Sequence, residues 1–299
     1  MRFTVWLICL AGCGRIGFDT TATDAAASRD VAGATLLGGP LISVDPASLP
    51  AFGTPMVVSE LVTAFEDDDP CLTRDGLELF FDSTRTDGGN DLHHTRRASI
   101  TDPWGPVLPI TELNTSTAEE HPSISGDGLT LYFTSGRAGN ADLWMATRPD
   151  RDSPFGSITV FAGVNDPAED QLGSVSTDGL SLMFSSYRLG GLTDDLYQSQ
   201  RVSPGGAWSA PVSISELNTG SYDRGPHLDD FGLAVFFESQ SELFWSSRPT
   251  IGTAWRAPIA IPELSSINDE SDPWLSPDLR TIYFARNTGG LKHIYTATR

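Results

Sequence analysis

The sequence has 299 residues, 39% of them hydrophobic, which is enough apolar material for one large all-β domain or two ordinary domains. Its 39 Asp and Glu residues outnumber 19 Lys and Arg residues, giving a formal net charge of −20 at pH 7. Such a chain repels phosphate backbones, which excludes nucleic acid as an expected partner, and no interior run approaches the ~18 apolar residues of a membrane helix.

The first residues have the organisation of an export signal. Arg2 precedes an apolar run from Phe3 to Leu10, and the sequence Leu-Ala-Gly-Cys ends at Cys13. This resembles a bacterial lipoprotein signal, in which a Leu and two small residues precede the acylated Cys. The resemblance implies a signal peptide over residues 1–12 and lipidation of Cys13; the alternative is an ordinary secretory signal. Because Gly14 follows the Cys, we expect anchoring to the outer membrane of the cell envelope, on its periplasmic or surface face.

Residues 13–50 are rich in Ala, Thr, Gly and Asp and have no periodicity, which predicts a flexible tether. In the processed chain the remaining cysteines are Cys13 and Cys71. We therefore expect no disulfide within one molecule.

A repeat runs through the rest of the chain. Five similar segments align on positions that carry glycine in four copies, spaced by 52, 51, 53 and 47 residues: Gly76, Gly128, Gly179, Gly232 and Leu279. Each unit predicts a strand, an Asp-Gly turn that tolerates positive φ, a second strand, a third strand ending in Arg, and a fourth strand after an aromatic residue.

The fourth strand is displaced in one copy. Four copies begin at Trp104, Phe155, Trp208 and Trp255, whereas the fifth is supplied by the N-terminal segment FGTPMVVSEL, residues 52–61. A propeller closes its ring when one terminus completes a blade that the other terminus forms. The fold class predicted is therefore all-β: a five-bladed β-propeller of four-stranded blades over residues 51–299, closed by an N-terminal strand.

The second repeat shows which family these units resemble. Its diagnostic residues are Glu119, Pro122-Ser123, Ser125, Asp127-Gly128, Tyr132-Phe133, Ser135-Gly136-Arg137 and Asp142-Leu143-Trp144. The pattern is similar to the TolB-type and WD-like propeller repeats of bacterial periplasmic proteins, and the resemblance covers residues 51–299. Two copies depart from it, with Phe231 in place of Asp and Leu279 in place of Gly. Tol-associated proteins carry an α/β domain before the propeller, where this chain has the tether, so a direct role in the Tol system is not implied.

An acid lies nine residues before each aligned position, and we expect these five acids to surround the channel mouth: Asp67, Glu119, Asp170, Asp223 and Glu270. Loop arginines Arg85, Arg137 and Arg188 are expected on the same face, as is His121. These acids and arginines could brace neighbouring loops, or the acids could form a ligand-binding or cation-binding ring. Catalysis is a third possibility.

The function predicted from these features is a non-catalytic binding or scaffolding propeller, monomeric, for an envelope protein or glycan. The alternative is a glycosidase-like enzyme that uses two carboxylates of the ring, although nothing in the sequence distinguishes one pair. No spacing of His or Cys predicts a dedicated metal site or cofactor. The acidic run at residues 66–70 could attract Ca²⁺.

Overall fold

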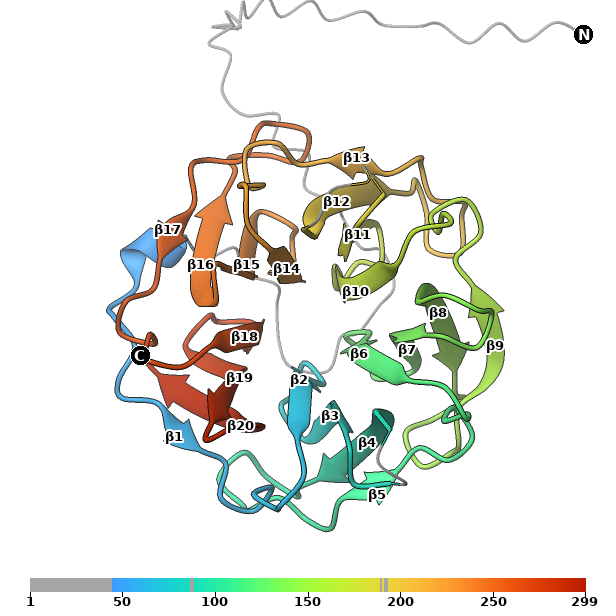
Figure 1. Ribbon diagram of the computed structural model, residues 1–299, viewed down its shortest axis with the longest axis vertical. Coiled ribbons are helices and arrows are strands. Elements are labelled where there is room, and N and C mark those ends of the chain that lie inside the picture. The colour runs from blue at the N-terminus through green and yellow to red at the C-terminus, as the bar shows by residue number, and fades with distance from the viewer. Residues whose placement is uncertain (1–44, 87–88, 189, 191–192) are drawn as a thin grey trace, which may run out of the picture. The chain divides into compact units, whose positions relative to one another are not determined.

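The computed structural model describes residues 45–86, 89–188, 190 and 193–299 (Figure 1). The predicted signal peptide, Cys13 and the tether up to residue 44 lie outside these residues. The described residues form five four-stranded antiparallel sheets arranged around a central channel, which confirms the predicted five-bladed propeller. Within the same part of the chain, no helix is long and apolar enough to cross a membrane.

Each blade uses its strands in chain order from the channel outward, apart from the fifth. The innermost strands are β2 (Asp67–Leu72), β6 (Glu119–Ile124), β10 (Asp170–Val175), β14 (Asp223–Leu228) and β18 (Glu270–Leu275). The second strands are β3 (Glu78–Ser83), β7 (Thr130–Ser135), β11 (Ser181–Ser186), β15 (Ala234–Ser239) and β19 (Thr281–Thr288). The third strands are β4 (Asp91–Arg96), β8 (Asp142–Thr147), β12 (Asp195–Gln200), β16 (Glu242–Ser247) and β20 (Leu291–Thr298). The outermost strands are β5 (Leu108–Pro109), β9 (Gly156–Val160), β13 (Val212–Ser213), β17 (Ile259–Ala260) and β1 (Met56–Val57).

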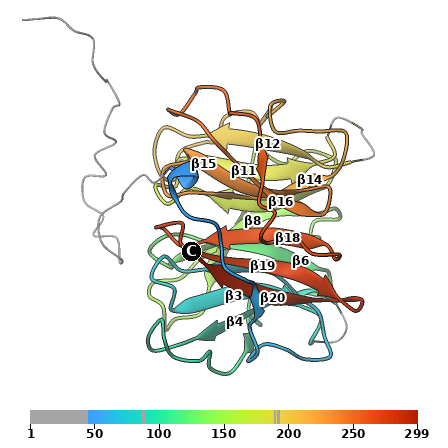
Figure 2. The same cartoon turned by 90° about the vertical axis from the view of Figure 1, so that its left-hand side faces the viewer.

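The N-terminal strand closes the ring, as predicted. β1 pairs with β20, with Met56 opposite Thr296 and Val57 opposite Tyr295. The Gly53 amide extends this pairing by donating to the Thr298 carbonyl at 2.8 Å. A short 3-10 helix, η1 (Pro46–Ser48), precedes the strand, and the blue N-terminal segment runs beside the red C-terminal blade (Figures 1 and 2).

The second strands supply most of the core because both of their faces pack against neighbouring blades. All six residues of β3, β11 and β15 are buried. The largest fully buried side chains are aromatic and lie on these second strands: Phe80, Phe81, Phe133, Phe184, Phe236, Phe237 and Phe284. This explains why the sequence reads as short apolar runs here rather than as an alternation of apolar and polar residues.

The arginine directly after each third strand has a structural role. Its guanidinium lies 4.2–4.6 Å from the centroid of the aromatic ring that opens the fourth strand, in the pairs Arg97–Trp104, Arg148–Phe155, Arg201–Trp208, Arg248–Trp255 and Arg299–Phe52. Its Nε donates to the backbone carbonyl of the aligned turn position, for example Gly76 at 2.8 Å and Leu279 at 2.7 Å. The repeated Arg and aromatic residues therefore clamp the hairpin turn of each blade.

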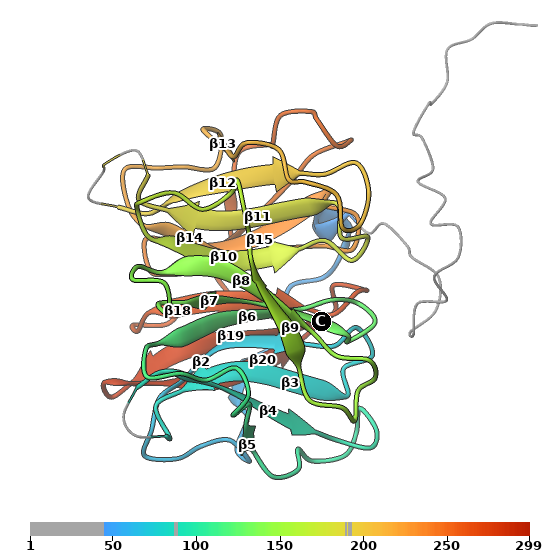
Figure 3. The same cartoon turned by 90° about the vertical axis from the view of Figure 1, so that its right-hand side faces the viewer.

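These contacts define two faces of the propeller. We call the face with the Asp-Gly turns and the clamping arginines the turn face, and the opposite face, where the innermost strands begin, the mouth face. The blades stack around the channel between the two faces, as the side views show (Figures 2 and 3).

Candidate functional site

The five acids predicted for the channel mouth are the first residues of the innermost strands, and all five are fully buried. Four of them pair with an arginine of the same blade, which lies in the loop after the second strand in three blades and within β19 in the fifth. The closest N–O distances are 2.6 Å for Arg85–Asp67, 3.5 Å for Arg137–Glu119, 2.6 Å for Arg188–Asp170 and 2.7 Å for Arg286–Glu270. The bracing arrangement considered from the sequence is thus present in four blades.

Each of these arginines has two further contacts. Its Nη2 donates to a carbonyl in the loop that leads into the innermost strand, as Arg188 does to Val164 at 2.9 Å. Its guanidinium also lies over aromatic rings of the blade, as Arg188 does over Phe184 and Tyr197. In the fourth blade Asp223 is held by Thr219, whose backbone amide donates to the carboxylate at 2.6 Å. Because these carboxylates are buried and committed to such partners, the channel is lined by other residues.

A β-bulge shifts the register in the innermost strand of every blade, just after the buried acid. In four blades the residue two positions after the acid has left-handed backbone, with φ between 52° and 58°: Asp69, His121, Gly225 and Asp272. Left-handed backbone is rare for residues other than glycine, and such strain gathers at functional sites. The bulge turns these positions toward the channel.

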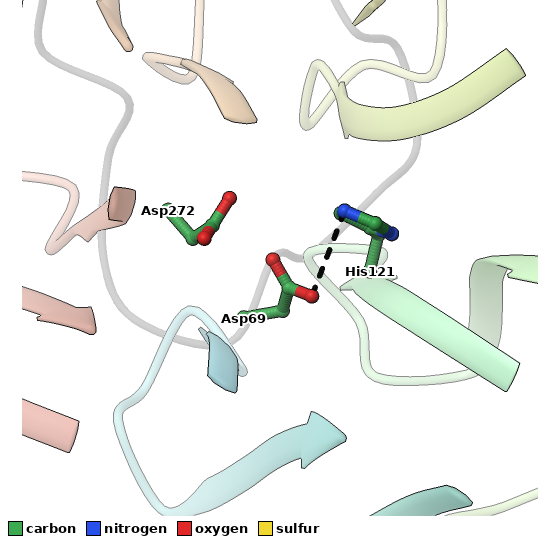
Figure 4. Close-up of side chains that lie close together, drawn as sticks. All are labelled: Asp69, His121 and Asp272. Atoms are coloured by element: carbon green, nitrogen blue, oxygen red, sulfur yellow. Dashed lines mark ion pairs between the residues drawn. The ribbon is translucent and has the colours of Figure 1, made fainter. Parts of the chain in front are cut away.

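Three of the bulge side chains meet in the channel. Asp69 of β2, His121 of β6 and Asp272 of β18 point toward one another, and each offers one ligand atom within 4.8 Å of the others (Figure 4). The closest ion pair joins Nε2 of His121 to Oδ2 of Asp69 at 3.7 Å. The surrounding cavity has a volume of about 30 Å³, room for one or two water-sized groups. His121 lines this cavity together with Asp69 and Asp272, and the five acids predicted for the channel mouth are not among its lining residues.

Charged neighbours surround this cluster. Lys292 forms an ion pair with Asp68 and lies 3.8 Å from Oδ2 of Asp272. Burial raises the pKa of Asp69 well above its usual range, and Asp272 adds to that effect. Burial opposes ionisation of Asp272 as well, but Lys292 and His121 outweigh it and lower the pKa of that carboxyl group.

Asp82 and Glu238 add two more carboxyl groups around the channel. Burial raises the pKa of Asp82, which hydrogen-bonds to Asp69. Burial also raises the pKa of Glu238 to about 8, and the Asp272 charge contributes. The channel therefore gathers several carboxyl groups whose ionisation burial opposes, with Lys292 beside Asp68 and Asp272.

The channel continues toward the turn face through a second small cavity of about 40 Å³. Cys71 lies here with its thiol buried, and burial raises its pKa to about 12. His227 also lines this space, and burial lowers its pKa to about 4, so the imidazole is neutral. A thiol with a raised pKa carries little thiolate, so Cys71 is a poor nucleophile here.

A larger groove of about 530 Å³ lies between the first two blades. Its polar floor is an ion-pair network in which Glu78 accepts from Arg148 at 2.7 Å, Arg96 at 3.0 Å and His94 at 3.1 Å. Burial opposes ionisation of Glu78, yet these donors lower its pKa to about 2. The charged groups of the floor are thus paired with one another.

The mouth face carries exposed apolar side chains on the loops that lead into the innermost strands. Their exposed fractions are 45% for Val62, 45% for Phe65, 43% for Tyr222 and 101% for Ile267. Exposed Glu169 and Asp269 stand immediately before β10 and β18, and Asp269 shares its loop with Ile267. The face therefore mixes apolar and acidic groups.

The sequence interpretation included Asp69 only as part of the acidic run at residues 66–70, and it missed Asp272 and Lys292. Alignment of the repeats could have exposed the two aspartates, because the position two residues after each buried acid carries Asp69, His121, Leu172, Gly225 and Asp272. Three copies carry an ionisable residue at this position and two do not. The side chain here therefore varies between blades, unlike the buried acid two residues before it. The repeat gave no reason to single out Lys292, because no other third strand has Lys at the equivalent position.

No protein-family model and no curated protein matches this sequence. Solved structures with similar folds include TolB from Acinetobacter baumannii, at 17% identity and a TM-score of 0.51, with 80% of this chain and 56% of that chain covered. The chain thus spans about half the length of that TolB protein. The shared feature is the TolB-type propeller fold.

Two further structures are similar over most of the chain. The catalytic domain of the GH62 α-L-arabinofuranosidase from Coprinopsis cinerea is 15% identical with a TM-score of 0.54, covering 87% of this chain and 95% of that one. A protein of unknown function from Dyadobacter fermentans is 12% identical with a TM-score of 0.55, covering 84% and 100%. At these identities the likeness establishes a common fold that both enzymes and other proteins use.

Proposed function

We propose that this chain is a non-catalytic binding propeller of the bacterial cell envelope, held there by a lipid on Cys13, and that its mouth face binds a protein. The observation that carries this proposal is the group of exposed apolar side chains around the channel mouth, Val62, Phe65, Tyr222 and Ile267. Apolar side chains rimmed by polar residues are typical of protein–protein contact surfaces.

The negative charge of the chain favours a partner with basic side chains. The chain has a net charge of −20, and exposed Glu169 and Asp269 lie on loops of the same face. A complementary partner presents basic and apolar side chains, and its association slows at high salt. A glycan partner, by contrast, would require convergent polar groups in an open depression.

The size of the channel site argues against sugar chemistry. A glycosidase needs two carboxyl groups about 5–10 Å apart on either side of a sugar ring. Here the ligand oxygens of Asp69 and Asp272 lie within 4.8 Å of each other beside a cavity of about 30 Å³, closer together than two carboxyl groups that flank a sugar ring. The five acids that begin the innermost strands are buried, and each accepts hydrogen bonds.

The test compares two groups of surface variants in the full chain. Val62→Ser, Phe65→Ser and Ile267→Ser together alter the mouth face, whereas Ile100→Ser and Val202→Ser remove residues with exposed fractions of 67% and 97% from loops on the turn face. Capture of a partner from envelope extract, followed by cross-linking, is expected to fail for the first group and persist for the second. Equal loss in both groups contradicts the proposal, and turnover of a glycan substrate favours the enzyme alternative.

The anchor has a separate test. Cys13→Ser is expected to abolish labelling with a palmitate analogue and to release the chain from the membrane fraction. Cys71→Ser is the matched control, because the Cys71 thiol is buried and must leave labelling unchanged. Continued labelling of the Cys13→Ser variant contradicts lipidation at this position.

A further inference from the structure

The cluster of Asp69, His121 and Asp272 brings together three potential metal ligands from the first, second and fifth blades. Their ligand atoms lie within 4.8 Å of one another, around a cavity with room for an ion and a water molecule (Figure 4). We propose that these three residues bind one divalent transition-metal ion, of which Zn²⁺ is the representative, at the centre of the channel.

Buried polar atoms behind the cluster support a ligand at this position. Asp82 is 2% exposed and hydrogen-bonds to Asp69, yet its Oδ1 has no hydrogen-bond partner within the described residues. Nδ1 of His121 is likewise buried and unpartnered in the described part of the chain. Buried polar atoms without partners are costly, and they often mark a place where water or an ion completes the structure. Outer carboxyl groups such as Asp82 commonly orient the carboxylates that ligate a metal.

Charge around the cluster also favours a cation. The carboxyl groups of Asp68, Asp82 and Asp272 surround Asp69, and Lys292 contacts Asp68 and Asp272. The neighbouring guanidinium of Arg224 lies near Asp194 and Glu238, with N–O distances of 3.5 and 4.0 Å. One ammonium group therefore faces several carboxyl groups, and an additional positive ion reduces their repulsion.

The ligand set selects the class of metal. Two carboxylates and one imidazole provide three protein ligands, the number that Zn²⁺ accepts in sites that keep one position for water. Ca²⁺ takes six to eight oxygen ligands and Mg²⁺ retains a near-octahedral water shell, so two carboxyl groups and one imidazole suit either ion less well. The cluster therefore suits Zn²⁺ or a similar ion better than Ca²⁺.

This inference is independent of the proposed partner at the mouth face, because its ligands lie inside the channel. The test is isothermal titration calorimetry of the full chain with ZnCl₂ after chelator treatment and dialysis. Binding of one Zn²⁺ per chain is expected, and CaCl₂ is expected to bind at least tenfold more weakly. Asp69→Asn, His121→Asn and Asp272→Asn should each weaken Zn²⁺ binding by about tenfold to a hundredfold.

Asn is chosen for all three variants because it tolerates left-handed backbone, so the bulge is preserved. His94→Ala is the matched control, since His94 lines the groove between the first two blades and must leave Zn²⁺ binding unchanged. Thermal unfolding without metal checks that each variant is folded. Absence of Zn²⁺ binding overturns the proposal, as does Zn²⁺ binding that survives His121→Asn or Ca²⁺ binding of equal strength.

Discussion

Each innermost strand has two positions, two residues apart, whose side chains have different roles. The first is a fully buried acid, such as Asp170, whose partners are an arginine and the preceding loop. The second is the bulge residue, such as Asp69 or Asp272, which faces the channel. The acid that repeats in every blade is part of the architecture, and the residue that varies from blade to blade gives the channel its chemistry.

The first prediction concerns a buried ion pair. Arg188→Ala leaves the fully buried Asp170 carboxylate without its guanidinium, and we expect a loss of about 3–5 kcal/mol in the free energy of unfolding. Urea unfolding measures this loss. The double variant Asp170→Asn, Arg188→Ala should be more stable than the single variant, because it removes the unpaired charge. A double variant as unstable as Arg188→Ala alone would show that the ion pair is not the cause.

The second prediction concerns acid stability. Because the folded pKa of Glu78 is about 2, below its ordinary value, the unfolded chain takes up the proton first. The stabilisation, about 3 kcal/mol, is therefore complete above about pH 5 and disappears as the pH falls toward 2. Glu78→Gln should lower stability at pH 7 and flatten the decline between pH 5 and 3 in urea titrations. Asp152→Asn, at a 93% exposed carboxylate, is expected to leave the decline unchanged.

At the scale of elements, the sequence predicted the strands well because turn chemistry and periodicity are local. The Asp-Gly turns, the apolar second strands and the arginine directly after each third strand all lie where the repeat placed them. The bulge could not be predicted from the sequence, because three of the four left-handed positions carry Asp69, His121 and Asp272 rather than glycine. A bulge adds one residue to a strand and needs no turn residue that would mark it in the sequence. The five predicted acids are buried, and four of them pair with arginine.

The third prediction tests the bulge of the fourth blade. At Gly225 φ is 58°, and a Cβ atom would lie 2.4 Å from Oδ1 of Asp272. Gly225→Ala should therefore displace Asp272 and cost about 3 kcal/mol, by overlap and backbone strain together. Gly205→Ala adds a methyl group at φ 77° where nothing lies within 4 Å, and its cost should be about 1 kcal/mol. Equal costs, measured by urea unfolding, would mean that backbone strain alone decides.

At the scale of the whole molecule, stability depends on closure of the ring by a strand of two residues. β1 joins β20 through Met56 and Val57, and Val58 donates to the Ile294 carbonyl at 2.9 Å. Without this segment the third strand of the fifth blade becomes an edge that can pair with another chain. Closure could be predicted from the displaced fourth strand because it depends on counting repeats rather than on side-chain geometry.

The fourth prediction follows from closure. A chain that lacks residues 1–58 should unfold at a lower urea concentration and form larger species in size-exclusion chromatography, because β20 is left unpaired. A chain that lacks residues 1–44 retains η1, Phe52 and β1, and its unfolding midpoint should match that of the full chain. Identical midpoints for the two truncated chains would show that β1 contributes nothing to closure.

The antiparallel pairing of β1 with β20 also decides how the molecule can be held. Gly53 bonds to Thr298, and Arg299 clamps the turn at Leu279, so the described chain enters β1 and ends on the same face. The innermost strands begin on the opposite face. A surface attached to Arg299 or to the chain just before β1 therefore lies on the turn face and leaves the mouth face exposed. A sensor chip coupled in this way presents the mouth face to a partner in solution.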